Sequence, residues 1–533
     1  MIKHCYIQAQ KQKIEISKEI VQNKLLLTIP KNWSSFDIYI EFTEVIKEVR
    51  NHDYNWIPLQ KETILYEYCP KIIRLNSGVL VQSNINQGYW IFSKQNPETL
   101  IWRFQPASSK QITQYNALHQ KQLIDTYIEK PFCTTPSLLF TTQYALEISR
   151  SKIPFTGIIC FTDHCDFDTL QNLELLRTFF KKHNITTTKG FFLNHFSKRN
   201  DNASFEYHRE ELIQWIQNGH ELCYHSLSQS IKSNQESKQD FLSFKAPLND
   251  INVWIDHGYQ PYNLSLYETS GYTNNEFLQV IDQNKIDVFW NYIDSGIATN
   301  EVINQLNAHH FTLGAFQKSV ANTHFKSKIA LLFKSVLFHY DNNPKHIRNY
   351  INFKMNWNSF TKTKKPKFLF QFIKNVIPVF GVVFKTAIFW SSIKKQVYKS
   401  AKYAPIIFKH TIKNKKITIF QTLEMVDFKK SLSPENIDTL VLEKGVCVAH
   451  TYFSDNMKHH SGKIILDNGK INSDVEANFE YLAKKIKNRE IWNPTLSEVV
   501  SYWKQIDEAV FDVDASSKIF LSTNHNLNTR EVY

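Results

Sequence analysis

The sequence predicts an α/β protein whose main domain is a distorted (β/α) barrel, preceded by a β-rich domain and interrupted by a basic helical insertion. Three observations favour this architecture. Residues 1–115 contain short β-rich runs, residues from 156 onward alternate between strand-like and helix-like patterns, and positive charge gathers between residues 341 and 416. With 533 residues, 42% of them hydrophobic, the chain can bury a sizeable core spread over several domains.

The first 115 residues are expected to form a small β-sheet or β-sandwich domain. Runs such as KLLLTIP, FDIYIEF, GVLVQS and TLIWRF are rich in β-branched and aromatic residues, and turn-forming residues separate them. No catalytic grouping stands out in this part of the chain. Residues 116–150, with Pro131 and Pro136, are interpreted as a linker.

The barrel is predicted in two pieces, residues 151–320 and 406–533. In the first piece GIICFT and TTKGFFLNHF are strands, LQNLELLRTFFKKH and REELIQWIQNG have the apolar spacing of helices, and HELCYHS is a third strand. In the second piece KKITIFQ and KGVCVAHTYF are strands followed by two amphipathic helices. Residues 321–405 form the predicted insertion. Repeated β–α units of this kind indicate a β/α barrel.

Cysteine usage and the first residues favour a reducing compartment. The seven cysteines are scattered, with no CxxC pair, so the sequence suggests neither a disulfide framework nor a zinc ribbon. The stretch MIKHCYIQAQKQK lacks the apolar core of a signal peptide. We therefore expect a cytoplasmic protein, held peripherally at the inner membrane by its insertion.

Ionisable residues gather directly after the first predicted barrel strand, in the run Asp163-His164-Cys165-Asp166-Phe167-Asp168. Carboxylates and an imidazole at one strand end are costly to bury unless they bind a cation or transfer a proton. Asp168 or Thr169 is the expected N-cap of the next helix. Which of Asp163, His164 and Asp166 acts as a base stays open at this stage.

A second grouping, Gly219-His220-Glu221-Leu222-Cys223-Tyr224-His225-Ser226, places His225 at the end of its strand. A lone histidine is more often structural than functional, but two polar groupings at matching strand ends favour a shared site. His195, Asp168 and His220 are interpreted as structural residues.

These segments resemble the NodB-homology polysaccharide deacetylases. In that family a strand ends in Asp-Asp, a base and a metal ligand, and about sixty residues later Gly-His-Glu precedes two metal-binding histidines. Here FTDHCD, the strand GFFLNHF and GHELCYHSLSQ follow in the same order and spacing. FWNYID resembles the Trp…Asp segment, VCVAH the strand with the catalytic histidine, and PTLSE the closing segment. The resemblance implies that Asp163 is the base, and that His450, oriented by Asp294, protonates the leaving amine.

The sequence departs from the family at three points. Gln229 stands where the second metal histidine is expected, Asp-His-Cys-Asp replaces Asp-Asp, and no Arg-Pro-Tyr motif is evident. WIDHG occupies the region of that motif, so His257 or Asp256 is the hypothetical replacement for the missing ligand. The predicted metal ligands are His164, Asp166, His225 and His257, for one divalent ion, expected to be zinc. Trp254, Asp256 and Trp290 are expected to bind substrate.

The insertion carries most of the positive charge. Between Asp341 and Lys416 there are sixteen lysines and one arginine against one acid, a net +16, which leaves about −3 for the rest of the chain. Residues 366–395 are apolar, but Lys374 and Lys385 interrupt them, and Pro378 and Gly381 are expected to break a helix. Helices lying on an anionic membrane surface are therefore expected for 341–416. A cap packed on the barrel is the alternative; nucleic-acid binding is not expected, because no motif accompanies the charge.

Together, the resemblance and the insertion imply a metal-dependent deacetylase acting on an acetylated sugar, such as a lipid-linked glycan precursor of a surface polysaccharide. A catalytically inactive glycan-binding or scaffold protein on the same barrel is the first alternative. A peripheral membrane hydrolase acting on another amide is the second.

Overall fold

The computed structural model describes most of the chain. Outside the description lie residues 10–11, 31–32, 34, 105–110, 116–120, 126–134, 200, 202, 231, 258–272, 295–302, 322–323, 342, 404–405, 414, 458–461 and 524, and the side chains of 111–115, 121–125, 292–294 and 399–400.

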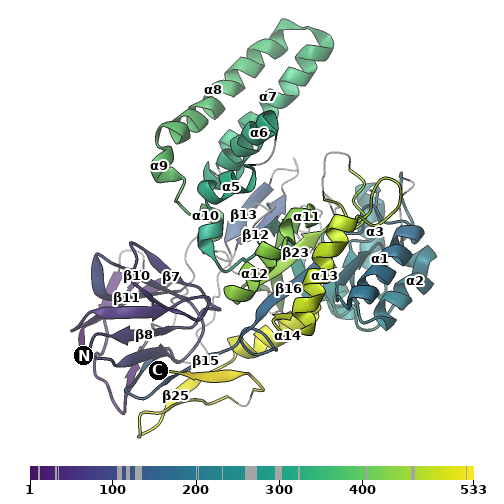
Figure 1. Cartoon of the computed structure of the whole chain (residues 1–533). Helices are drawn as coiled ribbons and strands as arrows, with labels where there is room; N and C mark the ends of the chain where they lie inside the picture. The colour runs from purple at the N-terminus through teal and green to yellow at the C-terminus, as the bar shows by residue number, and fades with distance from the viewer. Residues whose placement is uncertain are drawn as a thin grey trace.

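The N-terminal domain is a β-sandwich of two six-stranded antiparallel sheets (Figure 1). The first sheet comprises β2 (Gln12–Glu15), β1 (Ile2–Ala9), β4 (Phe36–Phe42), β11 (Asn96–Phe104), β10 (Tyr89–Ser93) and β7 (Thr63–Leu65). The second comprises β3 (Lys24–Leu26), β14 (Ser137–Thr141), β9 (Leu80–Ser83), β8 (Ile72–Leu75), β5 (Ile46–Arg50) and β6 (Trp56–Pro58). Alternate residues of β4 are buried, and side chains of both sheets share one core. β14 lies in the stretch interpreted as a linker, beyond the paired strands β12 (Gln111–Tyr115) and β13 (Lys121–Asp125).

The predicted barrel is confirmed: seven parallel strands close into a ring, because β17 pairs with both β18 and β16. In ring order they are β16 (Gly157–Asp163), β17 (Thr188–Phe191), β18 (Glu221–His225), β19 (Val253–Ile255), β20 (Val288–Asp294), β22 (Lys415–Met425) and β23 (Val446–Thr451). The short β24 (Ile491–Trp492) pairs with the start of β16, and β21 (Ile407–Ile412) runs antiparallel to β22.

Helices cover the outside of this ring (Figure 1). They are α1 (Leu170–His183), α2 (Phe205–Gln217), α3 (Asn234–Ser243), α4 (Asn274–Gln283), α11 (Phe428–Ser431), α12 (Pro434–Leu442), α13 (Ser473–Lys487) and α14 (Leu496–Asp507). Residues alternate along each strand: Ile158, Cys160 and Val448 belong to the inner core, whereas Ile159 and Phe161 pack against the helices.

Gly190 is required by close packing at the point where the ring closes. A Cβ on Gly190 of β17 would lie 2.4 Å from the carbonyl oxygen of Asp163 in β16. Only glycine allows the two strands to approach this closely beside the carboxyl end of β16.

The insertion between β20 and β21 is helical. It contains η2 (Ala308–His310), α5 (Leu313–Ser319), α6 (Phe325–Ser335), the π-helical η3 (Val336–Asp341), α7 (Pro344–Thr363), α8 (Pro366–Ile388), α9 (Trp390–Ile393) and α10 (Lys399–Lys402). α7 and α8 form an antiparallel hairpin that projects away from the barrel (Figure 1). Among the described helices, α8 has the length and apolar composition of a membrane span, and only 6% of its most apolar window is buried.

One expectation about the insertion was wrong, and the alternative placement as a cap does not hold for the hairpin. Pro378 and Gly381 do not break the helix, since α8 runs unbroken from Pro366 to Ile388. The carbonyl that loses its donor at Pro378 belongs to the exposed Lys374, where solvent can replace the bond. The alternative of a cap packed on the barrel also fails for this hairpin, because most of its apolar outer side chains are exposed.

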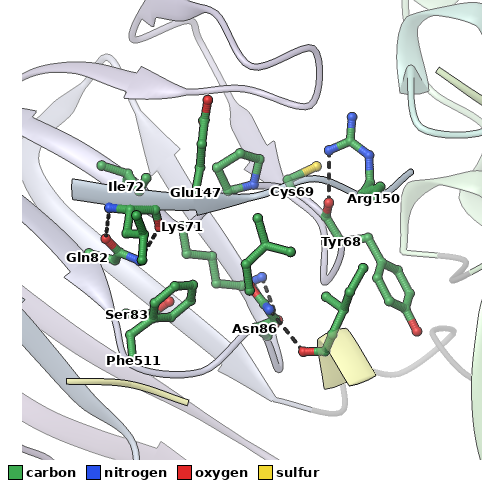
Figure 2. A pocket seen from close by; sticks show the side chains of 14 residues that line it. Tyr68, Cys69, Lys71, Ile72, Gln82, Ser83, Asn86, Glu147, Arg150 and Phe511 are labelled. Atoms are coloured by element: carbon green, nitrogen blue, oxygen red, sulfur yellow. Dashed lines mark hydrogen bonds between the residues drawn. The ribbon is translucent and has the colours of Figure 1, made fainter. Parts of the chain in front are cut away.

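The sandwich and barrel meet at a polar junction, where a pocket is lined by buried cations (Figure 2). The ammonium of Lys71 donates to three carbonyl oxygens, and the guanidinium of Arg150 donates to the carbonyl oxygens of Tyr68, His52 and Lys444. Lys71 thus binds acceptors within the sandwich, whereas Arg150 joins the two domains, because its acceptors Tyr68 and His52 belong to the sandwich and Lys444 to the barrel. The chain ends beside this junction with β25 (Phe511–Val513), β26 (Ile519–Leu521) and β27 (Thr529–Val532), which pairs with β15 (Ala145–Ile148).

Candidate metal centre

The carboxyl ends of the barrel strands bring together side chains from segments far apart in the sequence. His164 follows β16, His225 ends β18, His257 follows β19, and Trp290 and His450 lie in β20 and β23. All five were predicted site residues, and ring contacts or hydrogen bonds connect them. In β/α barrels this end of the strands carries the active site.

Asp166 lies between two histidines. Its Oδ2 is 3.0 Å from Nε2 of His225, and its Oδ1 is 3.1 Å from Nδ1 of His257. The two imidazole nitrogens lie 3.2 Å from each other. Ligands of a tetrahedral zinc ion at about 2.0–2.2 Å would lie roughly 3.3–3.6 Å apart. The three groups are therefore spaced almost as ligands of one ion would be.

Backbone carbonyls fix which nitrogen of each histidine faces Asp166. Nδ1 of His225 lies 3.3 Å from the carbonyl oxygen of Ile255, and Nε2 of His257 lies 2.7 Å from that of Gln229. A carbonyl only accepts, so in neutral imidazoles these nitrogens carry the proton and the opposite ones present lone pairs. Carbonyl-anchored histidines of this kind are typical of metal sites. Lone pairs and a carboxylate arranged in this way could hold a metal ion.

His164 completes the group. One ring nitrogen of His164 and the ligand atoms of Asp166 and His225 all lie within 4.8 Å of one another. The ring stacks on that of His450 at 3.9 Å between centroids, and its buried Nε2 has no hydrogen-bond partner among the described residues. An unsatisfied buried nitrogen beside two potential ligands fits a metal-binding role.

The pKa shifts in this group agree with that role. Burial lowers the pKa of His164 and of His225, so both are neutral and able to coordinate. Burial alone would raise the pKa of Asp166, but the imidazoles of His225 and His257 hold it well below its usual range. A neutral imidazole and an ionised carboxylate are the forms in which these side chains bind metals.

Residues next to His225 and His257 hold these two imidazoles in place. Ser226 adopts a left-handed φ of 57° directly after His225, and its hydroxyl accepts a bond from the backbone N–H of His257 at 2.9 Å. The ring of Phe192 packs against the imidazoles of His225 and His257, with centroids 5.3 and 5.2 Å away. Gln229 contributes its backbone carbonyl rather than a metal ligand.

The structure does not bring Asp163 into this group, which corrects its assignment as the base. Its carboxylate pairs with Lys189 and accepts from the hydroxyl of Thr451 at 3.2 Å and the N–H of Phe453 at 2.9 Å. Lys189 also binds Asp168, and all three side chains are buried. Asp163 lies one residue before His164, so strand alternation directs it to the outer layer. Burial raises its pKa to about 6 despite Lys189.

Trp254 and Asp256 also lie outside the group, against the expectation that they bind substrate. Trp254 belongs to the outer core with Tyr224 and Phe241, and its indole donates to Asp256 at 3.0 Å. Ile255 and His257, one residue away, take the inner positions. The side chain of Asp294 lies outside the described residues, although its backbone pairs with Thr422 in β22.

Trp290 does reach the site. Its ring contacts His164 and His450, with centroids 4.8 and 5.0 Å away, and its indole donates to the hydroxyl of Thr422 at 2.9 Å. Tyr452 was not identified from the sequence, and its ring contacts the rings of His164 and His450. These aromatic rings form a buried wall beside the ionisable groups.

Glu424 is a carboxylate that sequence reasoning missed. Its backbone pairs with His450 in the ladder between β22 and β23. Phe420 belongs to the inner core and Thr422 bonds to Trp290, so the period of two places Glu424 on the inner side as well. The same period in the segment FQTLEM could have identified it, had the register of the strand been known.

The described residues hold one other grouping with metal-ligand spacing, His183, Glu476 and Glu480. It lies on the outer helices α1 and α13, and Lys182 pairs with Glu476 at 2.7 Å. His183 is buried there, but Glu480 is exposed and Glu476 is paired with a lysine, so this grouping lies at the outer surface of the barrel, away from the strand ends.

Comparisons with known proteins add little. No family model and no curated protein matches the chain. Among solved structures, a GH31 dextranase of Flavobacterium johnsoniae in complex with isomaltotriose is similar over 49% of this chain and 34% of its own, at 8% identity and a TM-score of 0.21. The chain thus spans about a third of that protein, at a similarity too low to bear on function. The resemblance to deacetylases therefore rests on the sequence motifs alone.

Proposed function

We propose that the protein is a metal-dependent hydrolase that removes acetyl groups from an acetylated sugar. The observation that carries this proposal is the convergence of Asp166, His225 and His257, with His164 beside them, at the carboxyl end of a closed barrel. His164, Asp166 and His225 fall within the segments that resemble the deacetylase motifs, whereas His257 lies in WIDHG, where the family's Arg-Pro-Tyr motif is missing. A divalent ion at this position would polarise an acetyl carbonyl and lower the pKa of a water molecule.

The chain's own groups supply the remaining steps. Asp166 and the anchored histidines hold their lone pairs toward a common point, which costs no rearrangement when a ligand arrives. Because Asp163 is held by Lys189, the base has to come from elsewhere, and Glu424 is the carboxylate on the inner face beside His450. In the proposal, Glu424 accepts the proton of the attacking water, and His450 delivers one to the departing amine.

Metal content tests the proposal. We expect about one divalent ion per chain in wild type by elemental analysis, and its loss in His225→Ala and Asp166→Asn, which remove a ligand. His195→Ala is the matched control, since His195 stacks on Tyr207 away from the group. Acetate release from N-acetylated oligosaccharides should fall at least about 100-fold in the two ligand variants and stay unchanged in the control.

Different results identify the alternatives. No metal in wild type after incubation with zinc would overturn the proposal and favour a non-catalytic glycan-binding protein. Bound metal without acetate release from sugars, but with hydrolysis of other amides, would favour a peripheral membrane hydrolase that acts on another amide.

A further inference from the structure

Among the described residues, the hairpin of α7 and α8 leaves an apolar ridge largely uncovered, with one ring, that of Phe380, in contact with Phe333 of α6 at 5.5 Å between centroids. On α8 the residues that follow one another at helical spacing along its outer side are between 47% and 73% exposed, namely Phe370, Ile373, Ile377, Phe380, Phe384 and Ile388. Contiguous exposed apolar side chains mark interaction surfaces.

The ridge is not needed to hold the hairpin together. The opposite side of α8 packs on α7 through a small core of its own, in which Tyr350 and Val379 are buried and Phe353 contacts Phe372 with centroids 5.8 Å apart. Thr312 pairs with Val397 at the base of the insertion, so the hairpin has a fixed attachment. The ridge is therefore available for a partner.

Positive charge borders the ridge. The hairpin, residues 344–388, has eight lysines, one arginine and no acidic residue. Lys362, Lys364, Lys365 and Lys367 lie exposed at the turn, and Lys374 and Lys385 follow the flank of α8 eleven residues apart, on one side of the helix. A second copy of the chain would place like charges together, whereas an anionic surface would be attracted.

From this arrangement we infer that the hairpin docks on an anionic lipid bilayer, with the ridge in the acyl boundary and the lysines among the headgroups. α7 carries Lys345, Arg348 and Lys354 along its length, so a hairpin spanning the hydrocarbon core would bury charge, and only interfacial docking avoids this cost. Membranes present anionic lipids such as phosphatidylserine on their cytoplasmic leaflet. The inference is independent of the catalytic proposal.

Sedimentation with vesicles tests the docking. The full-length protein is expected to bind phosphatidylcholine vesicles containing about one third phosphatidylserine, and to bind pure phosphatidylcholine far more weakly. A ridge variant, Phe370→Ser with Ile377→Ser and Phe384→Ser, should lower the partition coefficient at least about 100-fold, since buried apolar area is lost. Its control places serine at Tyr207, Leu442 and Phe520, which are exposed on other elements.

Charge is tested in the same way. Lys→Glu at the four turn lysines should reduce binding by about 100-fold or more. The matched control reverses Lys181, Lys484, Lys487 and Lys504, exposed on barrel helices, and should bind like wild type. Metal content should be equal in all variants, which separates this test from that of the catalytic proposal.

Three results would overturn the inference. Equal binding of the ridge variant and wild type would show that no apolar insertion occurs. Equal binding to neutral and anionic vesicles would remove the role of the lysines. A dimer that the ridge variant converts to monomer, without vesicle binding in wild type, would assign the ridge to a second copy.

Discussion

Lys189 is fully enclosed between Asp163 and Asp168, close to the candidate metal-ligand group but outside it. Burial alone would lower the pKa of Lys189, yet the two carboxylates raise it, so the ammonium stays charged. Ser454 donates to the far oxygen of Asp168 at 2.6 Å, which adds a polar contact. This triad anchors β16 to β17 at the point where the ring closes, so it acts on stability rather than on chemistry.

Replacing Lys189 by Met should therefore destabilise the fold strongly. Two buried carboxylates would lose their only described cation, at a cost of about 3–5 kcal/mol. Urea unfolding at neutral pH measures the loss as a lower midpoint with an unchanged slope. The double variant with Asp163→Asn should recover part of the stability, because one charge is removed with its partner. A loss under about 1 kcal/mol would mean that water reaches the triad.

Glu424 is the residue whose substitution bears most directly on the proposed chemistry. Glu424→Gln keeps the shape but cannot accept a proton, so the turnover of an acetylated sugar should fall about 10²–10⁴-fold. Metal content should remain that of wild type, since the carboxylate is not among the proposed ligands. The variant should also lose the rise of rate on the acidic side of the pH profile. Glu435→Gln, on the outer helix α12, is the control.

If Glu424→Gln lost metal as well as activity, Glu424 would belong to the metal site. Unchanged turnover would exclude it as the base and return that role to another group in the site.

At the scale of whole elements, the sequence could locate the strand ends that carry the candidate site. The four candidate ligands lie at the carboxyl ends of strands in the order expected, and the ring brings these ends together; they are His164, Asp166, His225 and His257. Whether a side chain points into or out of the ring depends on the register of its strand, and a shift of one residue moves it to the opposite face. Asp163 and Trp254 were misassigned for this reason, each lying next to a residue that does face inward.

The insertion shows a second limit of sequence reasoning. Its charge and apolar character were read from composition, but whether its helices pack on the barrel depends on tertiary contacts that no local pattern encodes. Pro378 within α8 makes the same point, because an exposed helix with apolar packing on one side tolerates a proline that propensity alone would exclude.

For the molecule as a whole, buried histidines couple stability to pH. Burial lowers the pKa of His220 to about 4, with the charges of Lys189 and Arg177 adding to the effect. The unfolded chain binds a proton near pH 6.5 and the folded chain does not, so stability is present above that pH and is lost as pH falls toward 4. Burial also lowers the pKa of His52 and His410 to about 4, in the same direction.

We expect His220 alone to account for about 1–2 kcal/mol of the stability lost between pH 7 and pH 5. Urea midpoints at the two pH values, for wild type and His220→Gln, measure it: the variant should show the smaller difference. Equal differences in the two proteins would mean that His220 is protonated in the folded state as well.

The closure of the ring also determines when the centre can form during synthesis. Thr162 of β16 bonds to Ala449 of β23, 287 residues later in the chain, and His164 stacks on His450 at the same junction. A ribosome releases the three strands that carry all four candidate ligands, and then the whole basic hairpin, before β23, which completes the ring, emerges. Contacts of such sequence separation form late and slowly. Nascent chains therefore carry an open sheet edge until nearly the end of translation, and any cation acquired earlier would be held by an incomplete site.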